Sequence, residues 1–230
     1  GYIMISVICS VYNSERYLPK YLKYANDQFL KKFEIIFVDA SSNDNSLQVV
    51  KDFKFRNDIS VKILEEDSRI TIYEAWNIAV KEASGSFIVN WNTDDVLFPS
   101  ALQTYQSYID KNPNIDLFYS PCFLSRTQDP SSIFNIYNWP EYNHETLLQR
   151  CICGPFPLVR KASIEEVNYF NEKYESSGDY DMWLKLSKNN YKFKKIPEAI
   201  GYFLDRPDSV SKDRIHLAQQ EDREIQKKHA

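Results

Sequence analysis

The tetrapeptide Asn92-Thr93-Asp94-Asp95 places two adjacent carboxylates between two apolar runs. Carboxylates at the end of a buried strand are costly unless a positive partner meets them. Hard cations such as Mg²⁺ bind through one or two carboxylates together with substrate phosphate oxygens. The tetrapeptide therefore indicates a site for a metal and a diphosphate. The alternative is that Asp95 caps a helix beginning near Pro99, while Asp94 lies in a solvated loop.

Two more polar side chains follow apolar runs that read as strands. Asp39 ends the run 33–38, and its carboxylate could accept a hydrogen bond from the N3–H of a uracil or thymine base. Tyr12 follows the run 5–11 and offers a ring on which the base could stack. Taken separately, Asp39 as a loop cap and Tyr12 as a packing residue are ordinary. Together with Asp94 they describe base, ribose and phosphate positions along one edge.

Glycine-rich phosphate loops are absent from the sequence. No GxGxxG follows the first apolar run, no GxxxxGK[ST] occurs, and the chain has only 5 glycines. These observations argue against a dinucleotide-binding Rossmann site, a P-loop and a nucleotidyltransferase that depends on such a loop. Phosphate binding would therefore depend more strongly on a metal, which can neutralise charge that develops on a leaving group.

A second pair of carboxylates, Asp179 and Asp181, stands at the start of a predicted amphipathic helix that continues through 182–186. A helix N-terminus favours the ionised form of a carboxyl group, which would leave Asp179 competent as a general base. The alternative is that either aspartate merely caps the helix.

These residues require an α/β architecture to bring them together. Strand and helix signals alternate through the first half, which predicts a mostly parallel sheet flanked by helices. Because ligands bind beyond the carboxyl ends of such strands, the polar side chains that follow them should share a crevice. The predicted strands are 5–11, 33–38, 61–64, 87–91 and 117–120, and the predicted helices are one capped by Ser14, one through 47–53, and 72–83 and 99–111.

The second half has a different pattern. Aromatic residues and prolines are dispersed through 121–157, which predicts a loop-rich lid or acceptor region. A hairpin-like pair at 191–196 and 199–204 and a polar helix from 212 should follow the Asp179 helix. We therefore expect one domain with two halves: 1–120 holds the edge for base, ribose and phosphate, and 121–230 holds the loop-rich region and the Asp179 helix.

Composition narrows the class of partner. The net charge of −4 argues against nucleic acid, whose binding relies on clustered Lys and Arg. Four cysteines show neither paired zinc spacing nor the density of a disulfide scaffold, which favours a reducing compartment. We see no signal pattern and no apolar run of bilayer length, so we expect a soluble, cytoplasmic protein. Gly1 is not an initiator methionine, which is compatible with a piece of a longer chain that has further domains.

Five segments, in this order, resemble the family 2 glycosyltransferases, which have the GT-A fold. The resemblance covers residues 3 to about 211. The segments are SVI at 6–8 with YN at 12–13, FEIIFVD at 33–39 with SSND at 41–44, AWN at 75–77 with ASGSFI at 83–88, NTDD at 92–95, and GDYDMWL at 178–184. Each segment alone is weak, whereas five in order are specific.

The resemblance implies an inverting transfer of a sugar from a nucleotide diphosphate donor, UDP- or dTDP-linked, to a hydroxyl acceptor in polysaccharide or glycolipid assembly. In that scheme Ser10, Tyr12 and Asp39 hold the base, Asp94 binds Mg²⁺ or Mn²⁺ from the DxD position, and Asp179 deprotonates the acceptor. The acceptor would be a saccharide or a lipid-linked saccharide, with peripheral association at the inner face of the membrane. The other donor-site candidates are Ser41, Arg69, Asn77, Asn92, Thr93, Asp95 and Arg206.

The sequence departs from the family pattern at several positions. Asn92 replaces the first Asp of DxD, which should lower metal affinity, and Gly178 replaces a frequent Glu before the base. Where relatives often carry a His near the metal, this chain has Arg206, which could meet the diphosphate as a fixed cation. These departures leave open a degenerate GT-A domain that binds a nucleotide sugar within a larger assembly protein.

Overall fold

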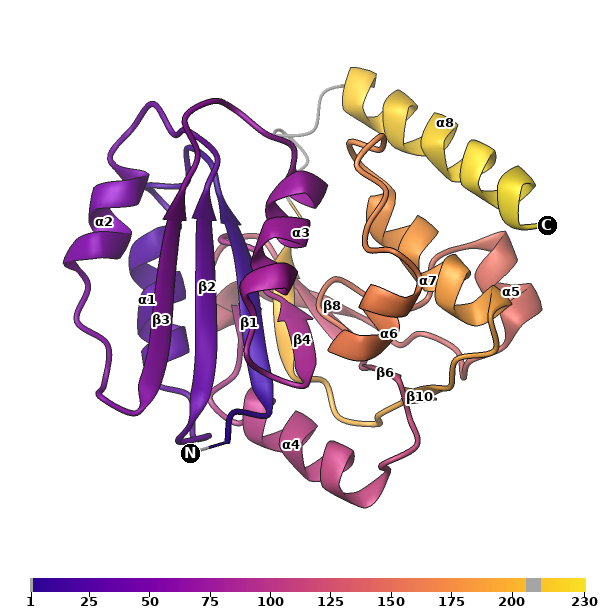
Figure 1. Ribbon diagram of the computed structural model, residues 1–230, viewed down its shortest axis with the longest axis horizontal. Coiled ribbons are helices and arrows are strands. Elements are labelled where there is room, and N and C mark those ends of the chain that lie inside the picture. The colour runs from indigo at the N-terminus through magenta and orange to yellow at the C-terminus, as the bar shows by residue number, and fades with distance from the viewer. Residues whose placement is uncertain (1, 206–211) are drawn as a thin grey trace.

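The structure, a computed structural model, describes residues 2–205 and 212–230. Within them a seven-stranded sheet runs in the order β10-β6-β9-β4-β1-β2-β3 (Figure 1). Four neighbouring strands are parallel: β1 (Ile5–Val11), β2 (Phe33–Asp39), β3 (Ile59–Glu65) and β4 (Phe87–Asn90). The predicted strands of the first half are confirmed, with ends that differ by one or two residues.

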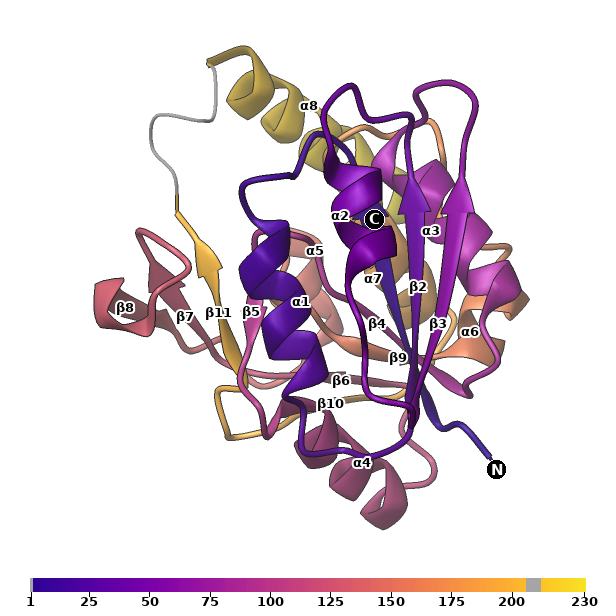
Figure 2. The same cartoon turned by 90° about the vertical axis from the view of Figure 1, so that its left-hand side faces the viewer.

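Helices cover both faces of this sheet. Successive residues of a strand point to opposite faces, so β1 sends Val7 and Cys9 into one apolar cluster and Ile8 into the other. The first cluster packs under α1 (Leu18–Asn26), α2 (Ser46–Asp52) and α4 (Ala101–Lys111). The second packs under α3 (Ile72–Glu82) and α7 (Gly178–Lys188). Figure 2 shows α1 and α3 on opposite sides of the strands, as expected for a three-layer α/β fold.

Two predicted helix starts are wrong. We expected Ser14 to cap the first helix, but α1 begins at Leu18, and Pro19 lies in its first turn, where its missing N–H does no harm. The Ser14 hydroxyl instead contacts the Tyr12 carbonyl oxygen at 3.0 Å. The helix after Pro99 begins at Ala101 rather than at the proline.

The second half completes the large sheet and builds a smaller one. β9 (Leu158–Arg160) is antiparallel to both β4 and β6 (Leu117–Tyr119), so the large sheet is mixed but mostly parallel. The four-stranded sheet has the order β5-β11-β7-β8. Its strands are β5 (Val96–Leu97), β11 (Gly201–Leu204), β7 (Cys122–Ser125) and β8 (Ile133–Tyr137).

The predicted hairpin at 191–204 is wrong. β10 (Phe193–Lys195) pairs with β6 in the large sheet, whereas β11 pairs with β7 in the small one. The local pattern gave two strands correctly, but their partners lie far away in the sequence. The segment 121–157 holds β7, β8, a short 3₁₀ turn at Pro130–Ser132 and α5 (His144–Gln149), joined by loops.

The C-terminal helix α8 (Lys212–His229) is confirmed and packs against α7 (Figure 1). Although α8 is mostly polar, one side of it is buried: Glu221, Ile225 and His229 are each less than 10% exposed. A further short helix, α6 (Lys161–Glu166), follows β9. Among the helices of the described residues, we find none with the length and apolar character needed to cross a membrane.

Candidate functional site

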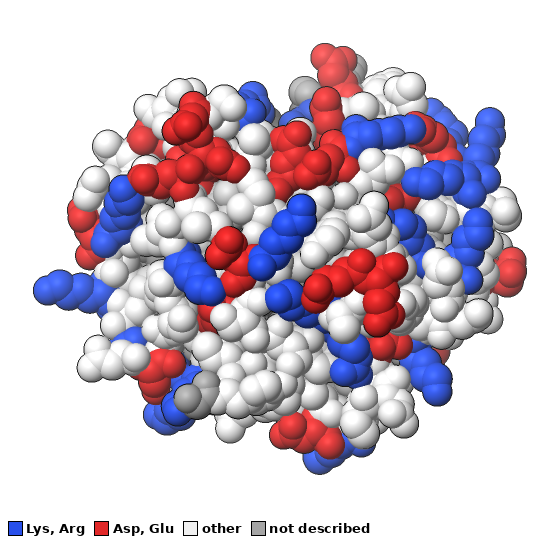
Figure 3. Space-filling view, in the orientation of Figure 1, with Lys and Arg blue, Asp and Glu red and all other residues white. Residues whose placement is uncertain are grey.

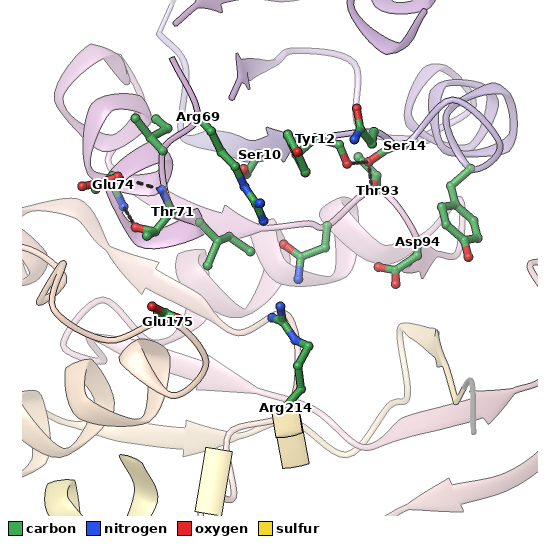
Figure 4. A pocket seen from close by; sticks show the side chains of 15 residues that line it. Ser10, Tyr12, Ser14, Arg69, Thr71, Glu74, Thr93, Asp94, Glu175 and Arg214 are labelled. Atoms are coloured by element: carbon green, nitrogen blue, oxygen red, sulfur yellow. Dashed lines mark hydrogen bonds between the residues drawn. The ribbon is translucent and has the colours of Figure 1, made fainter. Parts of the chain in front are cut away.

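A cavity of about 830 Å³ opens beyond the carboxyl ends of β1 and β4. The predicted crevice is therefore present, and six of the predicted site residues line it. The lining comprises Ser10, Tyr12, Asn13, Ser14, Tyr17, Arg69, Ile70, Thr71, Ile72, Glu74, Asn92, Thr93, Asp94, Glu175 and Arg214. Figure 4 shows that these side chains converge from two sides, with Arg69 and Asp94 on one side and Glu175 and Arg214 on the other.

The loops after β1 and β2 hold one another in place. Asn13 and Ser41 both have positive φ, +45° and +63°, a region that L residues rarely adopt. The Asn13 N–H donates to the Ser42 hydroxyl at 3.1 Å, and the Asn43 N–H donates to Asn13 Oδ1 at 2.8 Å. Such strained backbone persists only where the surroundings fix it. These contacts give the end of the sheet a fixed shape.

Asp39 lies at this end but does not line the cavity. It is 4% exposed, and its carboxylate accepts hydrogen bonds from the N–H and the hydroxyl of Ser42, at 3.2 and 2.7 Å. Tyr12 does line the cavity, and the Arg69 guanidinium lies 4.4 Å from its ring centroid. A stacked cation next to an aromatic ring suits a base joined to phosphate.

The Asn92–Asp95 turn separates its two carboxylates. The Asp95 N–H donates to the Asn92 carbonyl oxygen at 3.1 Å, and the Asp95 carbonyl oxygen accepts from Trp91 Nε1 at 2.9 Å. Asp95 is 5% exposed and closes the turn, whereas Asp94 lines the cavity. Thr93 is buried as well, and its hydroxyl donates to the Ser14 hydroxyl at 3.0 Å. Asp94 is thus the carboxylate of this turn that faces the cavity.

We tested whether these residues fit a divalent cation. In the described ranges there is no group of three or more His, Cys, Asp and Glu side chains able to hold a metal. Asn92 Oδ1 is buried without a hydrogen-bond partner there, and both Asn92 and Asp94 line the cavity. Two oxygen ligands fit a cation that takes its other ligands from a diphosphate and water. Asn92 and Asp94 alone would not complete the coordination of a metal ion.

Asp179 begins α7 and is partly exposed. Burial of the carboxyl group raises the pKa of Asp179 to about 6, although hydrogen bonds from the Tyr180 N–H and the Tyr73 hydroxyl act in the opposite direction. The Tyr73 hydroxyl lies 3.3 Å from Asp179 Oδ1. We expected the helix N-terminus to favour the ionised form, but desolvation is the larger effect. A pKa near 6 is well suited to a general base at neutral pH.

Gly178 has a steric reason to lack a side chain. A Cβ placed there would lie 2.7 Å from two atoms of the Tyr73 ring. A Glu side chain at this position would therefore require the Tyr73 ring to move. Glu175, three residues earlier, lines the cavity instead.

Other predicted residues lie elsewhere. Asn77 is 4% exposed and is fully engaged with Phe170, donating to its carbonyl oxygen and accepting from its N–H, each at 2.9 Å. Its amide therefore ties α3 to the segment before α7, and the proposed site does not include it. Arg206 lies outside the described residues. Ser41 does not line the cavity; it lies in the turn after β2, where its φ is positive.

The sequence prediction missed Glu175 and Arg214. Figure 4 shows Arg214 pointing from the start of α8 toward the cavity, opposite Arg69. No local pattern identified it, because Arg214 is one of many charged residues in a polar helix. Lys and Arg are mixed with Asp and Glu over the face shown in Figure 3, so this face offers no continuous basic surface.

Comparison with known proteins identifies the class. The family model described as glycosyl transferase family 2 matches residues 6–167. The chondroitin synthase of Pasteurella multocida is 31% identical over 195 residues, which are 84% of this chain and 20% of that protein. This chain therefore spans about a fifth of the length of that relative.

Solved structures agree on the fold. Staphylococcus aureus TarS 1-349 in complex with UDP matches with a TM-score of 0.77 and 24% identity, over 99% of this chain and 65% of that chain. The Pyrobaculum calidifontis mannosyltransferase PcManGT, in complex with GDP-Man and Mn²⁺, matches with a TM-score of 0.72 and 15% identity, over 98% and 63%. The fold is GT-A, as the sequence predicted. The chain belongs to glycosyl transferase family 2.

Proposed function

We propose that the chain is an inverting glycosyltransferase, which moves a sugar from a nucleotide diphosphate donor to a hydroxyl acceptor. The observation that carries the proposal is the cavity, which joins Tyr12 after β1 and Arg69 after β3 to Asp94 after β4. Glu175 brings the segment before the predicted base to the same cavity.

In this proposal the donor lies along the edge formed by the loops after β1 and β4. The base stacks near Tyr12, with Ser10 and Asp39 on its polar edge, and Arg69 and Arg214 are the cations placed to meet the diphosphate. Asp94 and Asn92 would hold Mg²⁺ or Mn²⁺ together with phosphate oxygens. When bound, the cation would neutralise charge on the departing diphosphate.

Asp179 acts on the acceptor. Its carboxylate accepts the proton of the acceptor hydroxyl, whose oxygen forms a bond to the anomeric carbon. The bond between that carbon and the diphosphate oxygen breaks, and the nucleoside diphosphate leaves with the bonding electrons. Attack from the face opposite the leaving group inverts the anomeric configuration. Because the pKa of Asp179 is about 6, the carboxylate is largely ionised at neutral pH.

The relatives suggest the substrate class. TarS is named a poly(ribitol-phosphate) N-acetylglucosaminyltransferase, and its solved structures contain UDP or UDP-GlcNAc. We therefore propose a UDP-linked donor and a role in polysaccharide or glycolipid assembly, on a saccharide or lipid-linked saccharide acceptor. All four cysteines are free thiols, which supports a reducing setting. The proposed location is the cytoplasm, at the inner face of the membrane.

A thermal-shift panel of UDP-, dTDP- and GDP-sugars, with Mn²⁺ or with EDTA, tests the proposal. A ligand that binds the native state raises the melting temperature, and we expect the largest rise with a UDP-sugar and Mn²⁺. Donors that bind are then tested for transfer to oligosaccharide acceptors and for slow donor hydrolysis. Binding without any turnover would contradict the enzyme and favour a degenerate binding domain. No binding by any donor would contradict both.

A further inference from the structure

Glu221 of α8 is a buried carboxylate outside the cavity, and its partners are backbone groups. It is 7% exposed. Its Oε1 accepts hydrogen bonds from the N–H groups of Ser176 and Ser177 at 2.8 and 2.9 Å, and its Oε2 accepts from the N–H of Glu175 at 3.0 Å. One side chain therefore satisfies three consecutive amides immediately before the Asp179 helix. Buried amides that lose such a partner are costly.

The same helix also holds the chain beyond Asp179. Asp181 is completely buried, and its Oδ1 accepts from Lys228 Nζ at 2.9 Å and lies 2.8 Å from His229 Nε2. The Ser177 hydroxyl donates to the Ala218 carbonyl oxygen at 3.4 Å. α8 therefore binds the segment on both sides of Asp179.

The opposite side of the segment is held by α3. The Tyr73 hydroxyl lies 2.7 Å from the Ser176 carbonyl oxygen, to which it can donate, and 3.3 Å from Asp179 Oδ1. The Glu221 contacts and the Tyr73 contact thus fix neighbouring peptide groups from two directions. The carboxyl of Asp179 lies between a helix of the first half of the chain and the C-terminal helix.

We propose that Glu221 is a positioning residue for the general base, which acts by fixing residues 175–177 and so the direction of the Asp179 carboxyl. The proposal rests on the proposed function, because it assigns Glu221 a task in sugar transfer. Glu221 does not line the cavity, so a donor bound there would not touch it. A misplacement of about 1 Å in a catalytic group can cost up to about 100-fold in rate, so loosening three anchored amides should be visible in kcat.

The test replaces Glu221→Gln, which keeps the size but turns one acceptor oxygen into a donor that faces an N–H. Glu224→Gln, one turn away on α8, is the matched control, because Glu224 pairs with Lys173 at the exposed surface. We expect kcat of E221Q to fall about 10- to 100-fold while the donor KM stays within about twofold, since apart from Arg214 the donor-site residues lie on the loops after β1, β3 and β4. E224Q should match the wild type in both.

The pH profile separates positioning from simple loss of folded protein. In E221Q the acid limb of the kcat profile should lie at lower pH than in the wild type. The reason is that a looser segment admits water to the Asp179 carboxyl, which lowers its pKa. Tyr73 of α3, Asp222 of α8 and the thiols of Cys151 and Cys153 also face this carboxyl and stay unchanged in both variants. A fall in kcat with an unmoved limb would mark a purely structural role and overturn the proposal.

Amide hydrogen exchange of 175–177 gives a readout that needs no activity. We expect faster exchange there in E221Q than in E224Q, with the core strands protected in both. Unchanged exchange overturns the proposal even if kcat falls. If E221Q does not fold, Glu221→Asp, which keeps the charge on a shorter stem, is measured in the same way. If the wild-type chain transfers no sugar, the proposed function is wrong. In that case amide exchange alone tests whether Glu221 anchors residues 175–177.

Discussion

The donor side, which is the wall of the cavity, and the acceptor side, which surrounds Asp179, are built in different ways. Apart from Arg214 of α8, the donor side consists of loops that follow β1, β3 and β4, in which each functional residue lies a few positions from a strand. The acceptor side joins Tyr73 to Asp179, which is 106 residues away, and Glu221 to Ser177, which is 44 residues away. The donor side depends on local chain geometry, whereas the acceptor side depends on long-range packing.

This difference suggests that the two sides have separate tasks, which substitutions can test. If the two sides act separately, a change on the acceptor side should alter the chemical step and spare donor binding. A change on the donor side should alter the affinity for nucleotide first. A variant that affects both quantities equally would contradict the division.

The largest effect is expected for Asp179→Asn. The amide cannot take up the acceptor proton, so kcat should fall about 100- to 10,000-fold, the usual contribution of a general base. Calorimetric affinity for the nucleotide should stay within about twofold of the wild type, because Asp179 does not line the donor cavity.

Asp110→Asn on α4 is the control for Asp179→Asn, since Asp110 is exposed and its Oδ1 accepts a hydrogen bond from Gln106 of the same helix at 3.1 Å. It should match the wild type. Transfer at the wild-type rate in the Asp179 variant would remove Asp179 from the mechanism.

The next effect is expected on the donor side, for Asp94→Ala. Loss of the carboxylate that faces the cavity should weaken nucleotide binding in Mn²⁺ about 10- to 100-fold, in the range found when metal-site partners are replaced. In EDTA the variant and the wild type should bind the nucleotide alike. Titration calorimetry in both conditions measures the difference, and equal affinities in Mn²⁺ would exclude Asp94 as a ligand.

The acceptor side should also set the pH dependence. The pKa of Asp179 is raised to about 6, so the base takes up a proton as the pH falls through that value. Below it, kcat should fall about tenfold per pH unit, because only the ionised base accepts a proton. Nucleotide affinity measured over the same range should change much less. If kcat and nucleotide affinity fell together over the same pH range, the titrating group would be on the donor side.

Stability should change with the opposite sign. The folded state holds the Asp179 proton more tightly than the unfolded chain, because burial raises the pKa. The cost of burying the charge is therefore present above about pH 6 and is relieved as the pH falls from 6 toward the ordinary value. Asp179→Asn should remove this contribution, which chemical denaturation at two pH values can measure.

The contrast between the two sides also explains how much of the fold and of the site could be predicted from the sequence. β1, β2 and β4 and the polar groups after them follow from apolar runs and their ends, so the cavity and Asp94 could be located. The partners of β10 and β11 could not, because short strands of similar pattern reveal no pairing. Arg214 and Glu221 are ordinary charges of a polar helix, and only packing of α8 on α7 brings them to the site.

Asp179 shows the same limit within a single residue. Its position at a helix start predicted an easily ionised carboxyl, but the raised pKa comes from neighbours that are distant in sequence. Asn77 shows the reverse case, since a residue within a family segment is engaged with Phe170. For both Asp179 and Asn77, the sequence gives the residue type but not the environment in which the fold places it.

The smallest effect we predict is a gain on the donor side. Asn92 Oδ1 is buried next to Asp94 without a hydrogen-bond partner in the part of the chain that the structure describes. Asn92→Asp adds a carboxylate at this position, and a divalent cation prefers a charged oxygen to a neutral one. We expect Mn²⁺-dependent nucleotide affinity to rise by roughly threefold to tenfold, or about 0.7 to 1.4 kcal/mol. In EDTA the same variant should bind more weakly than the wild type, because two carboxylates then face a diphosphate without a cation between them. Weaker binding in both conditions would show that Asn92 contacts the donor directly, and that the amide, rather than a metal, is what this side of the cavity requires.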